Sequence, residues 1–305
     1  MLFAEIRPMK TQHTINTTTS VQGIGLHSGR TCQVTFRKAP VDTGIVFIRD
    51  GVEIKASFEN VAETVFSTNL EKSGVKVRTV EHLVAALVGL GITNVFVDVE
   101  GPEIPILDGS ALPWVNLLLE AGIMSQHKAQ AVVKILKPVV YGEGSAYVMA
   151  LPGRGCRISC RLNFNHPAIR EEHMEISVEP EAFVRDIAGA RTFGFLKDVH
   201  ALRERGLAMG GSLDNAIVIG EDRVLNEGGL RYRNEFVRHK ILDILGDMGL
   251  FGCPIEGHLV ANESGHRLHL GFLKHLAVHQ SSWDIDARPV AKRSQYVPLS
   301  QEVAA

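Results

Sequence analysis

The chain has 305 residues, of which 45% are hydrophobic and 22% are charged, with 32 lysines and arginines against 34 aspartates and glutamates. This composition is typical of a globular protein of about two domains, and it excludes a disordered chain or a small disulfide-stabilised one. The formal net charge is −2 and there is no long basic run. We therefore expect no nucleic-acid partner.

Targeting and membrane signals are weak throughout the sequence. The longest largely apolar stretch, residues 83–97, contains glycines, Thr93 and Asn94 and falls short of the roughly 18 residues that a span needs. Glu5 and Arg7 precede any apolar region, which argues against a secretory signal. Four cysteines without C-x-x-C spacing favour a reducing compartment. The sequence thus predicts a cytoplasmic protein with at most peripheral membrane contact.

The N-terminal half begins as sheet and then changes period. Apolar residues alternate with polar ones over 32–37, and 44–50 is a second β-rich run. From Thr79, a candidate N-cap, the apolar spacing is that of a short helix that ends near Gly89. A strand over 94–100 and a helix over 110–121 are expected next.

Residues 125–130 are polar and aperiodic and predict a linker. We therefore expect an N-terminal domain over 1–126, a C-terminal domain over 127–284 and a polar tail over 285–305. In the second half sheet again precedes helix. The expected elements are strands over 158–164 and 215–219, and helices over 180–190, 196–207, 234–250 and 264–279.

The longest of these helices carries His239, Asp243 and Asp247 at spacings of four. Side chains at this spacing share one helix face. An imidazole and a carboxylate four apart can bind one cation, and a third protein ligand beside an open position is the pattern of catalytic zinc. The same spacing is common on solvated helix faces, so it is a weak signal when it stands alone.

Glu81 and His82 begin a helix in the other half of the chain. Consecutive helical side chains point about 100° apart. If His82 binds a metal, Glu81 is therefore free to act as general base on an attacking water. The alternative is a carboxylate that the helix N-terminus stabilises. His266 opens the last helix, where Asp247 would keep it protonated or where it has only a structural role.

Six motifs occur in a fixed order along the chain. They are G-I-G-L-H-S-G at 23–29, T-V-E-H-L at 79–83, P-E-I-P-I-L-D-G-S at 102–110, R-T-F-G-F at 191–195, E-F-V-R-H-K-I-L-D at 235–243 followed by Gly246 and Asp247, and S-G-H at 264–266. Together they resemble the UDP-3-O-acyl-N-acetylglucosamine deacetylase family, zinc amidases of lipid A biosynthesis.

The resemblance implies an α+β fold of two similar domains. Each is a sheet with helices on one face, and the helices are sandwiched between the two sheets. It implies a monomeric hydrolase that deacetylates UDP-3-O-(3-hydroxyacyl)-N-acetylglucosamine to the free amine plus acetate, the committed step towards lipopolysaccharide. A metal amidase for another N-acetylated sugar and a non-catalytic binding module are the alternatives. The cofactor implied is one Zn²⁺ ion, with Fe²⁺ as the other candidate.

Carried over residue by residue, the resemblance makes His82, His239 and Asp243 the metal ligands and Glu81 the general base. Thr192 would donate to the developing oxyanion. His266, supported by Asp247, would stabilise that oxyanion or protonate the leaving amine.

Substrate contacts follow in the same way from the resemblance. Phe193 would pack on the hexosamine, Phe164 on the uracil, and Lys240 would meet the phosphates. An insert over about 192–216 would wall the acyl-chain passage with Leu196, Val199, Leu202, Leu207, Gly211 and Ala216. Glu263 stands where relatives usually carry a basic residue, and we expect Arg267 or His269 to compensate.

Overall fold

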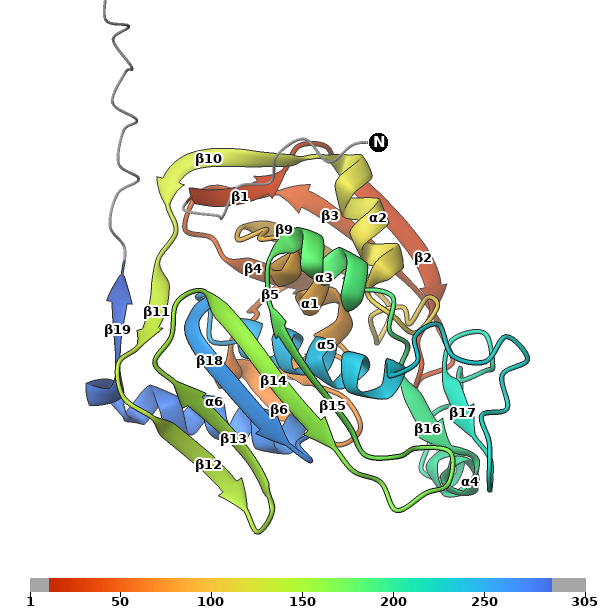
Figure 1. Cartoon of the computed structure of the whole chain (residues 1–305). Coiled ribbons are helices and arrows are strands. Elements are labelled where there is room, and N and C mark those ends of the chain that lie inside the picture. Colours follow the sequence, from red (N-terminus) through yellow and green to blue (C-terminus); the bar gives the residue numbers. More distant parts are fainter. Residues whose placement is uncertain (1–10, 287–305) are drawn as a thin grey trace, which may run out of the picture.

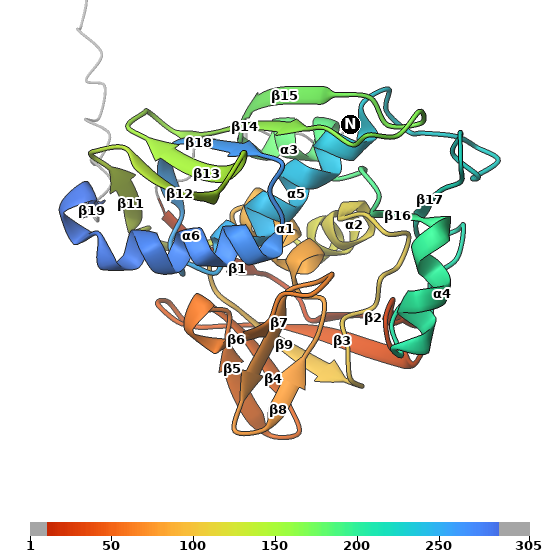
Figure 2. The same ribbon diagram turned by 90° about the horizontal axis from the view of Figure 1, so that it is seen from below.

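The computed structural model describes residues 11–286. Residues 287–305, the greater part of the predicted tail, lie outside the described residues. The fold is α+β, as expected, with two main sheets and helices between them (Figure 2). Among residues 11–286 no helix combines the length and apolar character that crossing a membrane requires.

The first sheet has five strands in the order β2-β3-β9-β4-β5. Neighbouring strands are antiparallel except β4 and β9, which are parallel. As predicted, Cys32, Val34 and Phe36 of β3 face the core. The strands are β2 (Thr19–Ile24), β3 (Thr31–Lys38), β4 (Ile45–Arg49), β5 (Val52–Lys55) and β9 (Val95–Glu100).

The second sheet repeats this pattern. Its strands run in the order β12-β13-β18-β14-β15, and the one parallel pair of these five is again formed by the strand that comes last in the chain, β18 with β14. The two halves are therefore similar, as the resemblance implied. The strands are β12 (Val139–Glu143), β13 (Ala146–Leu151), β14 (Cys156–Leu162), β15 (Glu172–Ser177) and β18 (Ile255–Asn262).

Helices fill the space between the two sheets (Figure 2). They are α1 (Glu81–Gly89), α2 (Leu112–Ala121), α3 (Pro180–Asp186), α5 (Glu235–Gly249) and α6 (His266–Val278). In each half one helix, α1 or α5, comes immediately before the last strand of the five, and these two helices pack together. Glycines allow the contact, since a Cβ at Gly246 would lie 2.2 Å from the carbonyl oxygen of Glu81 and one at Gly249 would lie 2.8 Å from Val84.

A small βαβ unit projects from the second half at one side of the molecule (Figures 1 and 2). It consists of β16 (Phe193–Phe195), α4 (Leu196–Glu204) and β17 (Ile217–Ile219), with the two strands parallel. None of the residues of α4 is buried. Backbone hydrogen bonds from Met209 and Gly210 to the carbonyls of His27 and Leu26 tie this unit to the first half.

The remaining short elements extend or link the sheets. A three-stranded sheet lies beside the first main sheet, and β11 and β19 extend the second. These elements are β1 (Thr11–Ile15), β6 (Val61–Glu63), β7 (Asn69–Lys72), β8 (Val75–Val77), β10 (Ile123–Ala129), β11 (Val132–Ile135) and β19 (Trp283–Asp286), with 3₁₀ turns over Phe58–Asn60 and Gln280–Ser282.

Several local predictions are wrong. The expected linker over 125–130 is largely β10, which pairs with β1 more than a hundred residues earlier (Figure 1). The helix expected over 180–190 ends at Asp186. Residues 285 and 286, assigned to the tail, belong to β19, which pairs with β11. Thr79 does not cap α1, because its side chain makes a different hydrogen bond.

Candidate metal site and catalytic cavity

The start of α1 is fixed by hydrogen bonds around Thr79. Its φ of +56° lies in the left-handed region, which is unfavourable for a β-branched residue. The side chain of Thr79 donates to Glu103 over 2.8 Å, and its backbone N–H donates to Asn69 over 3.1 Å. These bonds hold the strained residue in place, so that α1 begins at Glu81 with its first two side chains directed towards α5.

Three side chains from α1 and α5 converge as the spacing predicts. His239 Nε2 lies 3.3 Å and His82 Nε2 lies 3.8 Å from the same oxygen, Oδ1 of Asp243. One ligand atom from each residue lies within 4.8 Å of the others, and all three residues are buried. This is the separation expected of groups that surround a single small cation.

Their hydrogen bonds and charges suit metal binding. The ring of His239 donates from Nδ1 to the carbonyl of Ala190 over 3.1 Å, which leaves Nε2 free as a ligand. Burial and the neighbouring His239 lower the pKa of His82 to about 3, so its imidazole is neutral. Oδ1 of Asp243 is buried and has no hydrogen-bond partner among residues 11–286. Such an orphaned acceptor facing two neutral imidazoles fits a bound cation.

A second cluster, Asp247, His266 and His269, is saturated by hydrogen bonds instead. Oδ2 of Asp247 accepts from Nδ1 of both histidines over 2.7 Å, and Oδ1 accepts from the hydroxyl of Thr68 over 2.6 Å. No oxygen of Asp247 is left for a cation. We therefore interpret this cluster as a hydrogen-bonded support for His266.

Glu81 and His266 face each other across the cavity. Their closest atoms, Glu81 Oε1 and His266 Nε2, are 3.8 Å apart, and the backbone N–H of Thr68 donates to the other oxygen of Glu81. Burial raises the pKa of Glu81 to about 8, although His266 opposes this. Burial alone would lower the pKa of His266, but the charge and hydrogen bond of Asp247 raise it to about 9. The carboxylate of Glu81 therefore binds a proton tightly, and His266 is a cation at neutral pH.

The cavity that these groups line has a volume of about 170 Å³. Phe164 and Phe193 lie on its wall with ring centroids 5.9 Å apart. Lys240 also lines it, and its ammonium group lies 2.9 Å from Oδ2 of Asp243. The lining residues that the sequence singled out are Glu81, His82, Phe164, Thr192, Phe193, His239, Lys240, Asp243 and His266.

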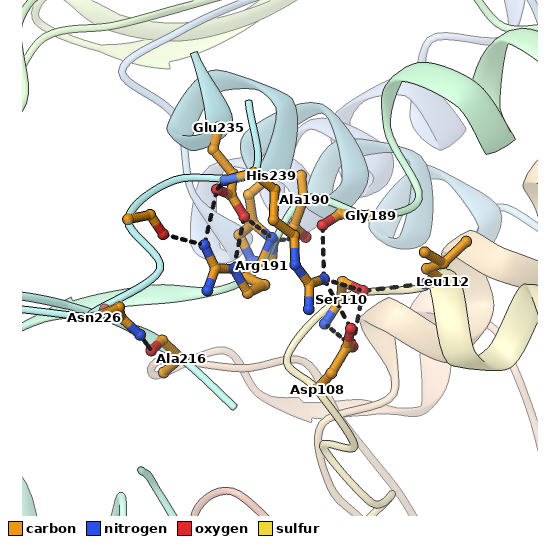
Figure 3. Close-up of polar contacts among 12 residues, drawn as sticks. Asp108, Ser110, Leu112, Gly189, Ala190, Arg191, Ala216, Asn226, Glu235 and His239 are labelled. Carbon is orange, nitrogen blue, oxygen red and sulfur yellow. Dashed lines mark hydrogen bonds and ion pairs between the residues drawn. The ribbon is translucent and has the colours of Figure 1, made fainter. Parts of the chain in front are cut away.

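A buried ion pair supports one wall of this cavity (Figure 3). Glu235 accepts from the guanidinium of Arg191 over 2.9 and 3.1 Å, from the backbone N–H of Arg191 over 3.0 Å, and from that of Arg231 over 2.6 Å. Arg231 reaches across to Asp108 of the first half over 2.8 Å. The pair fixes the segment around Arg191. The residue before Arg191 is Ala190, whose carbonyl accepts from His239, and the residue after it is Thr192, which lines the cavity.

The six insert residues expected to wall the acyl-chain passage do not line this cavity. Leu196 is 52% exposed, and Leu196, Val199, Leu202, Leu207, Gly211 and Ala216 are all absent from its wall. A Cβ at Gly211 would nevertheless lie 3.6 Å from the side chain of Leu26, which does line the cavity. The insert therefore lies next to the cavity without closing it.

We expected Arg267 or His269 to compensate for the basic residue that Glu263 replaces. For His269 this expectation is wrong, because His269 is fully buried against Asp247. Arg267 instead forms an exposed pair with Glu143 over 3.0 Å. Glu263 lies 3.6 Å from Arg161. These contacts leave Lys240 as the cationic side chain on the cavity wall, together with the imidazolium of His266.

Sequence reasoning missed several residues of the site. Thr68 contacts both Glu81 and Asp247, and Leu26, Phe66 and Thr79 line the cavity. All four lie outside the helices and strands, where no periodicity marks them. Leu26 and Thr79 stand within motifs, which is the one signal that could have found them.

The two repeats thus enclose a buried site of the kind found in metal-dependent hydrolases, with candidate metal ligands beside a carboxylate base and a cationic imidazole. A sequence profile of the LpxC family, described as UDP-3-O-acyl N-acetylglycosamine deacetylase, matches residues 12–278. The chain belongs to this family, which confirms the resemblance.

Curated relatives agree with the family assignment. A protein of Oleidesulfovibrio alaskensis, named UDP-3-O-acyl-N-acetylglucosamine deacetylase, is 48% identical over 303 residues, which cover 96% of this chain and 99% of that protein. Proteins with the same name from Syntrophus aciditrophicus and Acidithiobacillus ferrooxidans are 43% and 46% identical, over 89% and 86% of this chain and 88% of each relative.

Proposed function

We propose that this protein removes the acetyl group from UDP-3-O-(3-hydroxyacyl)-N-acetylglucosamine, giving the free amine and acetate in the committed step of lipid A biosynthesis. The observation that carries the proposal is the meeting of Glu81 and His266 beside the His82, His239 and Asp243 cluster in one cavity. A pure ligand-binding module has no need for a paired proton acceptor and proton donor there. Family membership supports the same substrate.

His82, His239 and Asp243 are the proposed ligands of one Zn²⁺ ion, because their two imidazole nitrogens and one carboxylate oxygen are donors that zinc accepts. Fe²⁺ accepts the same donors, so metal analysis must decide between them. When bound, the ion supplies Lewis-acid polarisation of the acetamide carbonyl and activation of water.

Glu81 is the proposed general base. Its pKa is raised by burial to about 8, so the ionised carboxylate has a high affinity for a proton. The hydrogen bond from the Thr68 N–H to Oε2 fixes the carboxylate and leaves Oε1 on the side of His266. Glu81 can therefore take a proton from an attacking water and hold it within the cavity.

His266 is the proposed acid. Asp247 keeps it protonated, so it can stabilise negative charge that develops on the carbonyl oxygen and then give a proton to the leaving amine. Thr192 lines the same cavity and is placed by the bond from its N–H to the Gly109 carbonyl, 2.8 Å long. We assign it as a second donor to the oxyanion.

The proposed substrate contacts are those that the family resemblance implies, and Phe164, Phe193 and Lys240 all line the cavity. We assign Phe193 to the hexosamine, Phe164 to the uracil and Lys240 to the phosphates, with the acyl chain running along the insert that contains Leu196, Val199, Gly211 and Ala216. A nucleotide-sugar substrate and free cysteines support a cytoplasmic location. We propose an N-terminal domain that ends with β10 and a C-terminal domain that runs from β11 to β19, in one monomer with at most peripheral membrane contact.

One preparation of the purified protein tests this function. It should contain about one equivalent of metal and release acetate from the 3-O-acylated UDP-sugar, and chelation should abolish that release. His239→Ala should lose both metal and turnover. Glu81→Gln should keep the metal and lose on the order of 10²- to 10⁴-fold in kcat.

Two results would contradict the proposal. Full activity in a metal-free preparation would remove the metal from the reaction. Release of acetate from other N-acetylated sugars at equal kcat/KM would favour the broader amidase.

A further inference from the structure

A second cavity, of about 520 Å³, lies mainly in the first half of the molecule, and four cationic side chains are among the residues that line it. It forms where the β4–β5 turn, the β7–β8 hairpin and the loop after Gly25 meet the end of α4. Arg30, Arg49, Lys76 and Arg78 line it together with one carboxylate, Asp50. Such a cluster is unexpected by composition, because the whole chain has a formal net charge of −2.

Two of the four cations are balanced by carboxylates and two are not. Lys76 lies 3.3 Å from both Glu63 and Glu71, and Arg49 lies 3.4 Å from Asp50. Within the part of the chain that the structure describes, no carboxylate pairs with the guanidinium of Arg30 or Arg78. The cavity therefore carries two uncompensated positive charges, which favours an anionic ligand.

This cavity is separate from the catalytic one. Thr79 lines the catalytic cavity and its neighbour Arg78 lines the cationic one. Glu103, fully buried, accepts hydrogen bonds from Thr79 on one side and from the backbone N–H of Ser28, a residue of the cationic cavity, on the other. An anion bound at Arg30 and Arg78 would thus occupy a different space from a substrate bound at Lys240.

Two exposed apolar side chains lie near the chain segment that carries Arg30. Met209 is 53% exposed, and a Cβ at Gly29, the residue before Arg30, would lie 3.0 Å from the Met209 Cβ. Ile24 is 41% exposed and lies beside Gly210. Cationic groups beside apolar side chains suit the headgroup region of an anionic membrane.

We propose that this cavity is a phosphate-binding site, in which the guanidinium groups of Arg30 and Arg78 hold the phosphate group of an anionic ligand. Guanidinium matches the geometry of phosphate oxygens and binds them through two parallel N–H donors. An anionic phospholipid headgroup and a free phosphate compound share this chemistry. The neighbouring Met209 and Ile24 favour the phospholipid.

Binding assays on the full-length, metal-loaded protein test the site in the absence of substrate. The first arm titrates pyrophosphate by calorimetry. The second measures cosedimentation with vesicles of phosphatidylcholine alone or with phosphatidylglycerol. The variants are Arg30→Gln and Arg78→Gln, with Arg154→Gln as the matched control, because Arg154 is exposed and lines neither cavity.

We expect Arg30→Gln and Arg78→Gln each to weaken pyrophosphate binding about tenfold or more, while Arg154→Gln binds as the wild type does. Loss of phosphatidylglycerol-dependent sedimentation in the same two variants would identify the ligand as a lipid headgroup. If the two substitutions weaken pyrophosphate binding but leave vesicle sedimentation unchanged, the site is supported and its ligand is a soluble phosphate compound.

The proposal is overturned if the wild type binds neither probe, or if Arg154→Gln weakens binding as much as Arg30→Gln does. Arg30 is exposed, so its replacement leaves the core unchanged, and thermal unfolding of each variant checks this. Deacetylation by Arg30→Gln should stay within about twofold of wild type at saturating substrate, because the two cavities are separate.

Discussion

The buried pair of Glu235 and Arg191 offers a sharp test of how the cavity wall is held. The change Glu235→Gln keeps the shape of the side chain and removes its charge. In the structure the Glu235 carboxylate is fully buried and accepts four hydrogen bonds, three of them from Arg191. The variant keeps one acceptor oxygen but no charge, so Arg191, a residue that is only 8% exposed, loses its counter-charge and keeps the Gly229 carbonyl at 2.8 Å as its unchanged acceptor.

Removing one partner of a buried ion pair costs about 3–5 kcal/mol in the free energy of unfolding, because the other charge stays buried without its counter-charge. For a chain of this size each kcal/mol lowers Tm by about 2 °C, so we expect Glu235→Gln to lower it by about 6–10 °C. The control is Glu143→Gln. Glu143 pairs with Arg267, and both side chains are more than half exposed, so this change should lower Tm by about 2 °C or less.

A second measurement separates the positioning of the site from stability alone. Loosening Arg191 should also loosen the Ala190 carbonyl that accepts from His239 Nδ1, and metal should then pass to an excess of chelator about tenfold faster or more. This is measured at 20 °C, where the variant stays folded. If the Tm of Glu235→Gln lies within 2 °C of the Tm of Glu143→Gln, or if the two variants lose their metal at the same rate, the ion pair does not hold this wall of the cavity.

Three further predictions follow from the same geometry. Gly246→Ala should lower Tm and speed metal loss, because its Cβ would lie 2.2 Å from the Glu81 carbonyl oxygen and that clash outweighs a gain of about 1 kcal/mol in helix propensity; a Tm equal to wild type would disprove the close contact. The profile of kcat/KM against pH should rise as Glu81 loses its proton and fall as His266 loses its own, and both limbs should lie below the metal-free pKa values of about 8 and about 9 because a bound cation disfavours the protonated form of each group. An alkaline limb that survives unchanged in His266→Ala would reassign that limb to another group. Gly211→Leu should penalise long 3-O-acyl chains and spare short ones, since each buried methylene contributes about 0.8 kcal/mol; an equal loss for every chain length would place the acyl passage elsewhere.

The part of the site that sequence predicts well is the part that one helix fixes locally. His239 and Asp243 lie on one face of α5 because helical spacing alone puts them there. That His82 meets them is a tertiary fact, which depends on the close approach of α1 to α5 at Gly246 and Gly249. Glycines inside a helix are usually taken as weak helix formers, so a single sequence does not reveal them as contact points.

Other features were missed because their partners are distant or belong to the backbone. The strand β10 has a polar sequence without alternation, and its pairing with β1 depends on a segment more than a hundred residues away. The groups that position the catalytic side chains include the Ala190 carbonyl and the Thr68 N–H. Backbone donors and acceptors carry no signal in the side-chain pattern, so only the fold reveals them.

The two aspartates of α5 show where spacing stops and environment begins to decide function. Asp243 and Asp247 are one helical turn apart on the same face, and both are buried. Every oxygen of Asp247 accepts a hydrogen bond, from Thr68 and two histidines, so its charge stabilises the protonated form of His266. Oδ1 of Asp243 has no hydrogen-bond partner within 11–286 and faces two neutral imidazoles. The two residues are chemically the same, so their surroundings alone give them different proposed roles. Asp247 keeps His266 protonated, and Asp243 is a metal ligand.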